Sequence, residues 1–113
     1  MRIKTNELTR AALDWAVAKC EGRQEPEVVN NFAVAWYTWP NTHYSTNWAQ
    51  GGPIIEREEI TVARRGGQSF SPWGAVLQGF EFDEEGPTPL IAAMRCYVAS
   101  KLGDEVEIPE ELK

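Results

Sequence analysis

The amino-acid sequence predicts an α+β fold, in which two apolar helices pack on a small, mainly antiparallel sheet. Apolar residues recur at helical spacing near both ends of the chain, and stretches rich in β-forming residues lie between them. This segregated order argues against a doubly wound parallel sheet, in which strands and helices alternate. A chain of 113 residues is long enough for one core, and we interpret residues 1–113 as a single domain.

Two helices are expected. The first is predicted over residues 5–21, with Thr5 as the N-cap and helically spaced apolar residues behind it. The second is predicted over residues 89–102, because Thr88 suits the N-cap and Pro89 suits the first helical position, where a missing N–H group costs nothing. Both helices are so apolar that each should be buried on more than one side.

The sheet is expected between these helices. Residues 54–63 and 73–82 alternate imperfectly between apolar and polar types, and a glycine-containing stretch joins them as a loose hairpin. Residues 28–39 are rich in β-forming and aromatic residues and are expected to contribute to the sheet. Residues 40–53 are then a long loop. The tail over 104–113 holds Val106 and Ile108, which are expected to dock as a short extended segment.

Charge is unevenly distributed along the chain. Residues 1–80 carry eight acidic and eight basic residues, so the net charge of −6 belongs to residues 81–113. A basic stripe is needed to neutralise phosphates, so the sequence argues against duplex nucleic acid as a partner. No stretch approaches the roughly 20 apolar residues of a membrane span, and the N-terminus lacks an apolar signal core. We therefore expect no membrane partner and a cytoplasmic location.

The sequence predicts no cofactor and no metal site. His43 is the single histidine, and no cysteine pair has the spacing of metal ligands. Cys20 and Cys96 lie in separate helical patterns and are expected to be reduced, buried thiols.

Aromatic residues are concentrated between Phe32 and Trp48, a stretch that holds three of the five tryptophans. Small, amide and hydroxyl side chains lie among the rings. This combination suits a flat polar ligand, because rings supply contact area and amides supply direction. For any single ring, burial in the core is the alternative. The predicted ligand-binding residues are Trp39, Tyr44, Asn47, Trp48, Gln50, Gly51, Gly52 and Arg95.

Arg95 is included because it is a lone charge in the middle of the second apolar helix. An unpaired buried charge is too costly, so the guanidinium either forms a salt bridge or faces an anionic ligand.

Catalysis is not expected. His43 could act as a general base, and Glu56 with Glu58 could present two carboxylates on one strand face. The alternative interpretation is that His43 is a polar loop residue and that Glu56 and Glu58 lie on a solvated strand face. No nucleophile with a base and an orienting group can be identified, so we predict a protein that is not an enzyme.

Three stretches of the sequence resemble the NinX-like proteins of lambdoid phages and prophages. They run from Lys4 to Gly22, from Tyr44 to Glu58 and from Gly86 to Gly103. The resemblance spans nearly the whole chain, and it implies a phage origin and a location in the host cytoplasm. The family is a domain of unknown function, so the resemblance implies no catalytic residues.

Two binding functions remain open. The first is a small-ligand protein that sequesters a nucleotide-like compound, such as a nucleotide-derived host signal; this expectation comes from phage biology. The second is an inhibitor or adaptor that contacts a host or phage protein through the aromatic residues, with acidic residues of the C-terminal third around them. The polar residues among the rings favour the ligand. A homodimer is also expected, since both helices look too apolar for one chain to cover.

Overall fold

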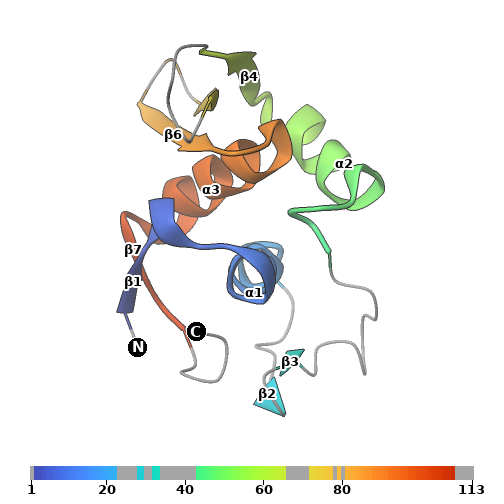
Figure 1. Cartoon of the computed structure of the whole chain (residues 1–113), viewed down its shortest axis with the longest axis vertical. Helices are drawn as coiled ribbons and strands as arrows, with labels where there is room; N and C mark the ends of the chain where they lie inside the picture. Colours follow the sequence, from blue (N-terminus) through green and yellow to red (C-terminus); the bar gives the residue numbers. More distant parts are fainter. Residues whose placement is uncertain are drawn as a thin grey trace.

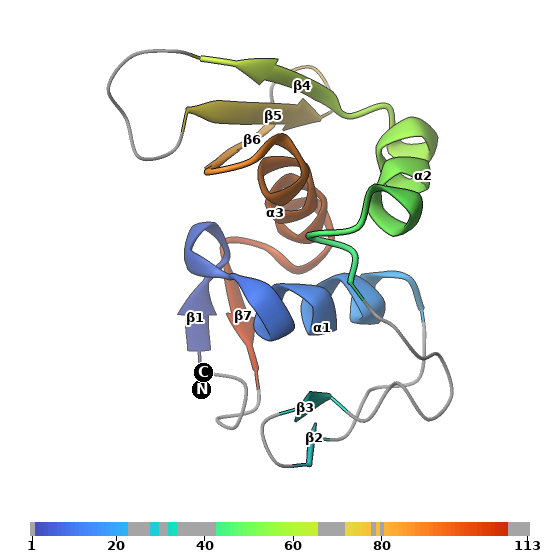
Figure 2. The same ribbon diagram turned by 45° about the vertical axis from the view of Figure 1, so that its right-hand side comes forward.

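The protein has an α+β fold, as the sequence predicts. The computed structural model describes residues 2–22, 28–29, 32–33, 43–65, 72–77, 79 and 81–108. Within these residues, helix α3 (Pro89–Leu102) is central: a three-stranded sheet lies on one side of it and helix α1 (Arg10–Cys20) on the other (Figure 2). Helix α2 (Trp48–Glu58) packs along α3 at the edge of this arrangement (Figure 1).

Helix α3 forms as the sequence predicts. The Thr88 side chain accepts a hydrogen bond from the backbone N–H of Ile91 (3.1 Å), and Pro89 occupies the first turn. Gly103 ends the helix with a φ of 91°, a conformation that glycine adopts without strain. Nine of its fourteen residues are buried, including Arg95. The helix is therefore an internal element, which explains its apolar composition.

The three-stranded sheet is antiparallel, with the order β4 (Thr61–Arg64), β5 (Trp73–Leu77), β6 (Phe82–Gly86). The predicted strand over 73–82 is thus confirmed only over its first half, because it joins β5 to the first residue of β6. At the end of β6, a Cβ atom on Gly86 would lie 2.8 Å from the backbone nitrogen of Ala92. Glycine at this position lets the strand contact the backbone of α3.

The predicted strand over 54–63 is wrong over its first half, because residues 54–58 belong to helix α2, and it is confirmed only over residues 61–63, which belong to β4. Asn47 begins this helix by accepting a hydrogen bond from the backbone N–H of Ala49 (2.8 Å). Residues 51–53 are Gly-Gly-Pro, which are weak helix formers by themselves, and they obscure the helical pattern. Burial of Ile54 in the core stabilises the helix and overrides local propensity.

The first predicted helix begins later than expected. A 3-10 turn, η1 (Thr5–Glu7), precedes α1, and Thr9 is the residue before its first turn. The hydroxyl of Thr5 is buried and donates a hydrogen bond to the carbonyl of Gly103 (2.6 Å). Thr5 therefore joins the N-terminal segment to the end of α3 instead of capping α1.

The chain ends pair with each other. Strand β1 (Arg2–Lys4) is antiparallel to β7 (Glu105–Glu107). Val106 and Ile108 are buried, which confirms that the tail docks as an extended segment. Strands β2 (Val28–Val29) and β3 (Phe32–Ala33) form a separate antiparallel pair, so this part of 28–39 does not join the main sheet. Residues 34–39 lie outside the described part of the chain.

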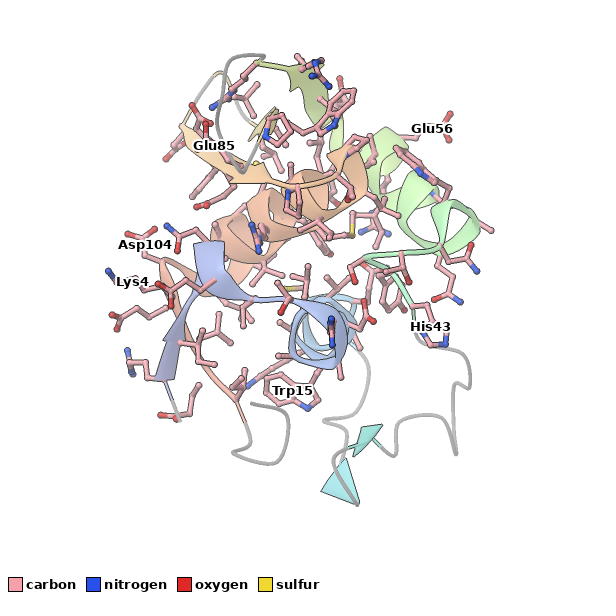
Figure 3. The ribbon with its side chains drawn as sticks, in the orientation of Figure 1. Lys4, Trp15, His43, Glu56, Glu85 and Asp104 are labelled. Carbon is pink, nitrogen blue, oxygen red and sulfur yellow. The ribbon has the colours of Figure 1, made fainter. Side chains whose placement is uncertain are left out.

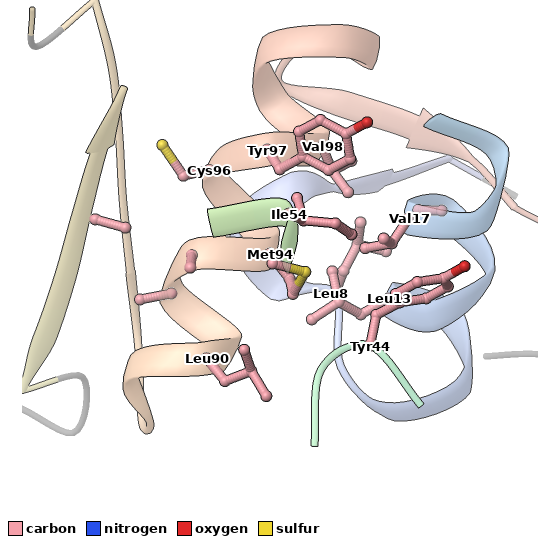
Figure 4. Close-up of a cluster of buried hydrophobic side chains, with 14 of the residues drawn as sticks. Leu8, Leu13, Val17, Tyr44, Ile54, Leu90, Met94, Cys96, Tyr97 and Val98 are labelled. Atoms are coloured by element: carbon pink, nitrogen blue, oxygen red, sulfur yellow. The ribbon is translucent and has the colours of Figure 1, made fainter. Parts of the chain in front are cut away.

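The core fills the space between α1, α2 and α3, which the close-up in Figure 4 shows, and extends to the sheet through Ala75 and Leu77 of β5. Each helix contributes apolar side chains, and the turn before α2 adds one aromatic ring. The labelled side chains are Leu8, Leu13, Val17, Tyr44, Ile54, Leu90, Met94, Cys96, Tyr97 and Val98. Cys20 and Cys96 are free thiols, and Cys96 is fully buried. No helix in the described part of the chain is both long and apolar enough to cross a membrane.

Candidate functional site

The predicted loop over 40–53 is, within its described part, a turn followed by the first turns of α2. Residues 43–47 form the turn, in which the backbone N–H of Asn47 donates to the carbonyl of His43 (2.8 Å). The side-chain oxygen of Gln50 accepts a hydrogen bond from the backbone N–H of His43 (2.6 Å). The oxygens of Asn47 and Gln50 thus hold the local backbone.

Trp48 is the exposed large apolar residue among the described residues, with 54% of its surface accessible. It occupies the first position of α2. The ring lies beside the next turn of the helix, since a Cβ atom on Gly52 would be 3.9 Å from Cε3 of Trp48. The ring is therefore accessible for contact with a partner.

Tyr44 and Gly51 are packing residues. The ring of Tyr44 belongs to the core and is only 7% exposed. A Cβ atom on Gly51 would lie 2.5 Å from the carbonyl oxygen of Tyr44 and 2.6 Å from Cδ1 of Leu90. The absence of a side chain at Gly51 therefore allows α2 to approach Tyr44 and α3. At Gly52, by contrast, the space is not filled by backbone.

The turn is fixed to α1 through Asp14. The carboxylate of Asp14 accepts a hydrogen bond from the backbone N–H of Ser45 (2.8 Å), and both residues are buried. Burial raises the pKa of Asp14 above its ordinary value of 3.8, against the opposing effects of the hydrogen bonding by Ser45 and the charge of His43. This bond sets the position of the turn that leads to Trp48.

Arg95 is held by backbone carbonyls. Its side chain is nearly enclosed, and the residue is 6% exposed. Nε donates to the carbonyl of Leu8 (3.0 Å), and Nη1 donates to the carbonyl of Glu85 (2.8 Å). The sequence left a salt bridge as one alternative for Arg95. Among the described residues, no carboxylate forms a salt bridge with it. Burial lowers the pKa of Arg95, and the nearby charge of Glu84 partly offsets this effect.

The structure separates Arg95 from the aromatic segment. Its hydrogen-bond partners belong to the segment before α1 and to β6, and Figure 3 shows Glu85 and His43 on opposite sides of the molecule. Trp48 and Arg95 thus belong to two different surfaces. Trp39, the remaining predicted ring, lies outside the described residues.

The residues considered for catalysis are not assembled into a reactive group in the described part of the chain. His43 and Glu56 are exposed, and the two glutamates at 56 and 58 lie on a helix instead of a strand face. The hydroxyl oxygen of Ser45 is buried and has no hydrogen-bond partner. Within the described ranges, no group of His, Cys, Asp and Glu side chains is arranged to hold a metal ion.

Two ion-pair groups were not expected from the sequence. Arg57 forms a two-pronged contact with Glu21, at 2.6 and 3.1 Å, and Glu21 also accepts a hydrogen bond from the hydroxyl of Tyr97 (2.6 Å). Arg65 pairs with Asp83 (2.6 Å) and with a second acid of β6. The sequence signal that indicates the second group is the acidic run at 81–85.

Residues 4–101 match the profile of the family described as Bacteriophage P22, NinX. The match covers most of the chain and includes Trp48, Arg95 and all three helices except the last residue of α3. The chain belongs to the NinX family. Among curated proteins, no match is found. Family membership confirms the resemblance seen in the sequence and leaves the function to be argued from the surfaces described above.

Proposed function

We propose that this chain is a non-enzymatic, phage-encoded binding protein that contacts a host or phage protein through Trp48. The observation that carries the proposal is the 54% exposure of this ring in a small domain. Tryptophan often dominates the energetics of protein interfaces, because its rigid ring buries a large area at low entropic cost. Membership of the NinX family supports a phage origin, and we propose the host cytoplasm as the place of action.

The groups around Trp48 favour a protein over a small ligand. The ring of Tyr44 is in the core, so it is not available for stacking. The oxygens of Asn47 and Gln50, which were predicted to read a ligand, accept hydrogen bonds from backbone N–H groups. What remains is one large ring with polar neighbours, the arrangement of an interface anchor inside a polar rim.

The acidic part of the chain does not supply that rim. Glu85 and Asp104 lie across the molecule from His43 in Figure 3. The partner surface opposite Trp48 is therefore proposed to be an apolar pocket with polar edges, without a requirement for basic residues.

The test compares the full-length chain with Trp48→Ala and with Glu56→Ala, an exposed position on the same helix. Immobilised wild-type protein is incubated with host extract, the enriched protein is identified by mass spectrometry, and its affinity for all three chains is then measured. Loss of an anchor ring should weaken binding about 30-fold, whereas Glu56→Ala should change it little. Unfolding in urea is measured in parallel. An unchanged affinity in a stably folded Trp48→Ala variant would refute this proposal.

A second candidate function is the binding of a small flat ligand, such as a nucleotide-like compound, stacked on Trp48. It is favoured by Asn47, whose side-chain nitrogen has no hydrogen-bond partner in the described part of the chain and lies one residue before the ring. This amide offers two donors to a ligand edge. Native mass spectrometry of protein purified from bacterial extract would show a co-purified compound directly.

Asn47→Asp separates the two candidates. Aspartate caps a helix as well as asparagine does, so α2 should remain folded, but the two N–H donors are lost. Binding of a flat ligand should weaken in this variant. Binding of a protein anchored by the ring should be nearly unchanged.

A second copy of this chain is a further possible partner. The dimer was expected because the helices looked too apolar, but α1 and α3 bury most of their apolar residues within the chain itself. That reason no longer applies. A light-scattering mass of one chain would exclude the dimer, and a dimer lost in Trp48→Ala would identify the chain as its own partner.

A further inference from the structure

A charged hollow lies on the surface that contains Arg95. Its volume is about 420 Å³, within the range of small-ligand sites. It is formed where η1, the end of β4, strand β6 and helix α3 meet, on the side of the molecule where Figure 3 labels Glu85. The residues around it are Asn6, Arg65, Asp83, Glu84, Glu85 and Arg95.

Three of these charged residues pair with one another and together carry a net charge of −1. Arg65 contacts the carboxylates of Asp83 (2.6 Å) and Glu85 (3.5 Å). Its side chain crosses strand β5 directly over Gly74, where any side chain would block it. These pairs form within the protein and are partly exposed. A charged ligand would therefore add little to their stability.

Arg95 and Glu84 are different, because neither forms an ion pair with any described residue. Two nitrogens of Arg95 bind carbonyls, and Nη2 is left with its two N–H donors. Arg95 borders the hollow, and Nη2 is the guanidinium nitrogen that has donors left for a ligand there. Glu84 is half-buried, and burial together with the charge of Asp104 raises the pKa of its carboxyl group. Arg95 and Glu84 attract each other without forming a salt bridge, so a cation and a carboxylate border the same space and can each still contact a ligand.

We propose that this hollow binds a small zwitterion, a free α-amino acid, with its carboxylate on Nη2 of Arg95 and its ammonium group on Glu84. A guanidinium is the preferred protein group for a carboxylate, and a carboxylate is the matching group for an ammonium ion. A simple anion fits less well, because the hollow holds three acidic residues against two arginines. A simple cation would be repelled by Arg95, which borders the same space.

The experiment follows backbone amide shifts of the full-length ¹⁵N-labelled chain during titration with each of the twenty common L-amino acids. The amino acid that binds best is then compared with its N-acetyl derivative, which lacks the ammonium group, and with its amide, which lacks the carboxylate. Both derivatives should bind at least about fivefold more weakly. The affected signals should come from the residues that border the hollow.

The variants are Glu84→Gln and, as a matched control, Glu81→Gln, an exposed residue just before β6 that does not border the hollow. Arg95 itself also holds two carbonyls, so its substitution would mix binding with folding. Glu84→Gln should weaken binding of the amino acid about fivefold and leave the already weak binding of the N-acetyl derivative unchanged. Glu81→Gln should change neither affinity.

Two results would overturn the site: no shift at about 10 mM of any amino acid, or an equal effect of Glu84→Gln on the acetylated and unmodified ligands. This site is independent of the proposed function, because Trp48 does not border the hollow. Trp48→Ala should therefore leave amino-acid binding unchanged, and a loss of binding in that variant would also contradict the site.

Discussion

Gly51 and Gly52 are consecutive residues of α2, yet they meet different surroundings. Around Gly51, the carbonyl oxygen of Tyr44 and the side chain of Leu90 occupy the space that a Cβ atom would need. At Gly52, the nearest atom belongs to the ring of Trp48, at an ordinary contact distance of 3.9 Å. The first glycine is required by packing, and the second only weakens the helix.

This difference predicts opposite effects of alanine at the two positions. Gly51→Ala forces α2 away from Tyr44 and should lower the free energy of unfolding by about 1–3 kcal/mol, the usual cost of overpacking. Gly52→Ala should raise it by about 0.5–1 kcal/mol, because alanine is the better helix former. Urea unfolding of both variants measures these changes. Equal destabilisation by the two would contradict the packing described here.

For Arg95, the sequence predicts that the charge has a partner but does not identify that partner. A lone charge in an apolar helix predicts that some partner must exist, because burial without one is too costly. The identity of the partners cannot be predicted locally. One is the carbonyl of Leu8, 87 residues away, and the other is a carbonyl of β6. Backbone carbonyls leave no signature in side-chain chemistry, so the choice between salt bridge and ligand could not have included them.

At the scale of elements, the C-terminal end of α2 contains an unfavourable residue. The backbone N–H of Ile60 donates to the carbonyl of Ile55 (3.0 Å), and Glu59 adopts a left-handed conformation with φ 56°. This is the Schellman arrangement, in which glycine is the preferred residue at the left-handed position. A glutamate there costs backbone strain that glycine would not have.

Glu59→Gly should therefore stabilise the protein by about 1 kcal/mol, a reversal of the usual effect of glycine. The matched control is Glu56→Gly, which is exposed inside the same helix and should destabilise by about 1 kcal/mol. Both values are measured by thermal and urea unfolding. A loss of stability in both variants would show that the helix does not end at Glu59.

The two helices α2 and α3 differ in how well the sequence predicts them. For α3, all local signals agree: Thr88 caps it, Pro89 begins it, and the residues between are apolar. For α2, the Gly-Gly-Pro sequence opposes the helix, and only packing of Ile54 and the close approach at Gly51 make it favourable. The sequence therefore predicted the fold class and α3, but it assigned α2 to a loop and a strand. The predicted ligand residues from Asn47 to Gly52 therefore lie at the start of a helix, and not in the predicted loop.

For the molecule as a whole, contacts between distant segments hold the functional surfaces in place. Strand β1 pairs with β7, and β7 contacts α3, so both terminal strands are held near this helix. The turn at 43–47 is held by the hydrogen bond from Ser45 to Asp14 of α1. Without this contact, the start of α2 and the ring of Trp48 would have fewer constraints on their position. Asp14 is therefore a residue whose ionisation affects the stability of the entire fold.

The last prediction concerns this carboxylate and the dependence of stability on pH. Its folded pKa lies above the ordinary value of 3.8, so the folded protein binds the proton more tightly than the unfolded chain does. The contribution of Asp14 to stability should thus fall as pH rises from about 4 through the raised pKa, and level off above it. Asp14→Asn removes the titration, and its side-chain oxygen still accepts the N–H of Ser45. The free energy of unfolding of this variant minus that of wild type should therefore increase with pH between about 4 and 7, as measured by urea unfolding. A constant or decreasing difference for Asp14→Asn would show that burial does not dominate at this carboxylate.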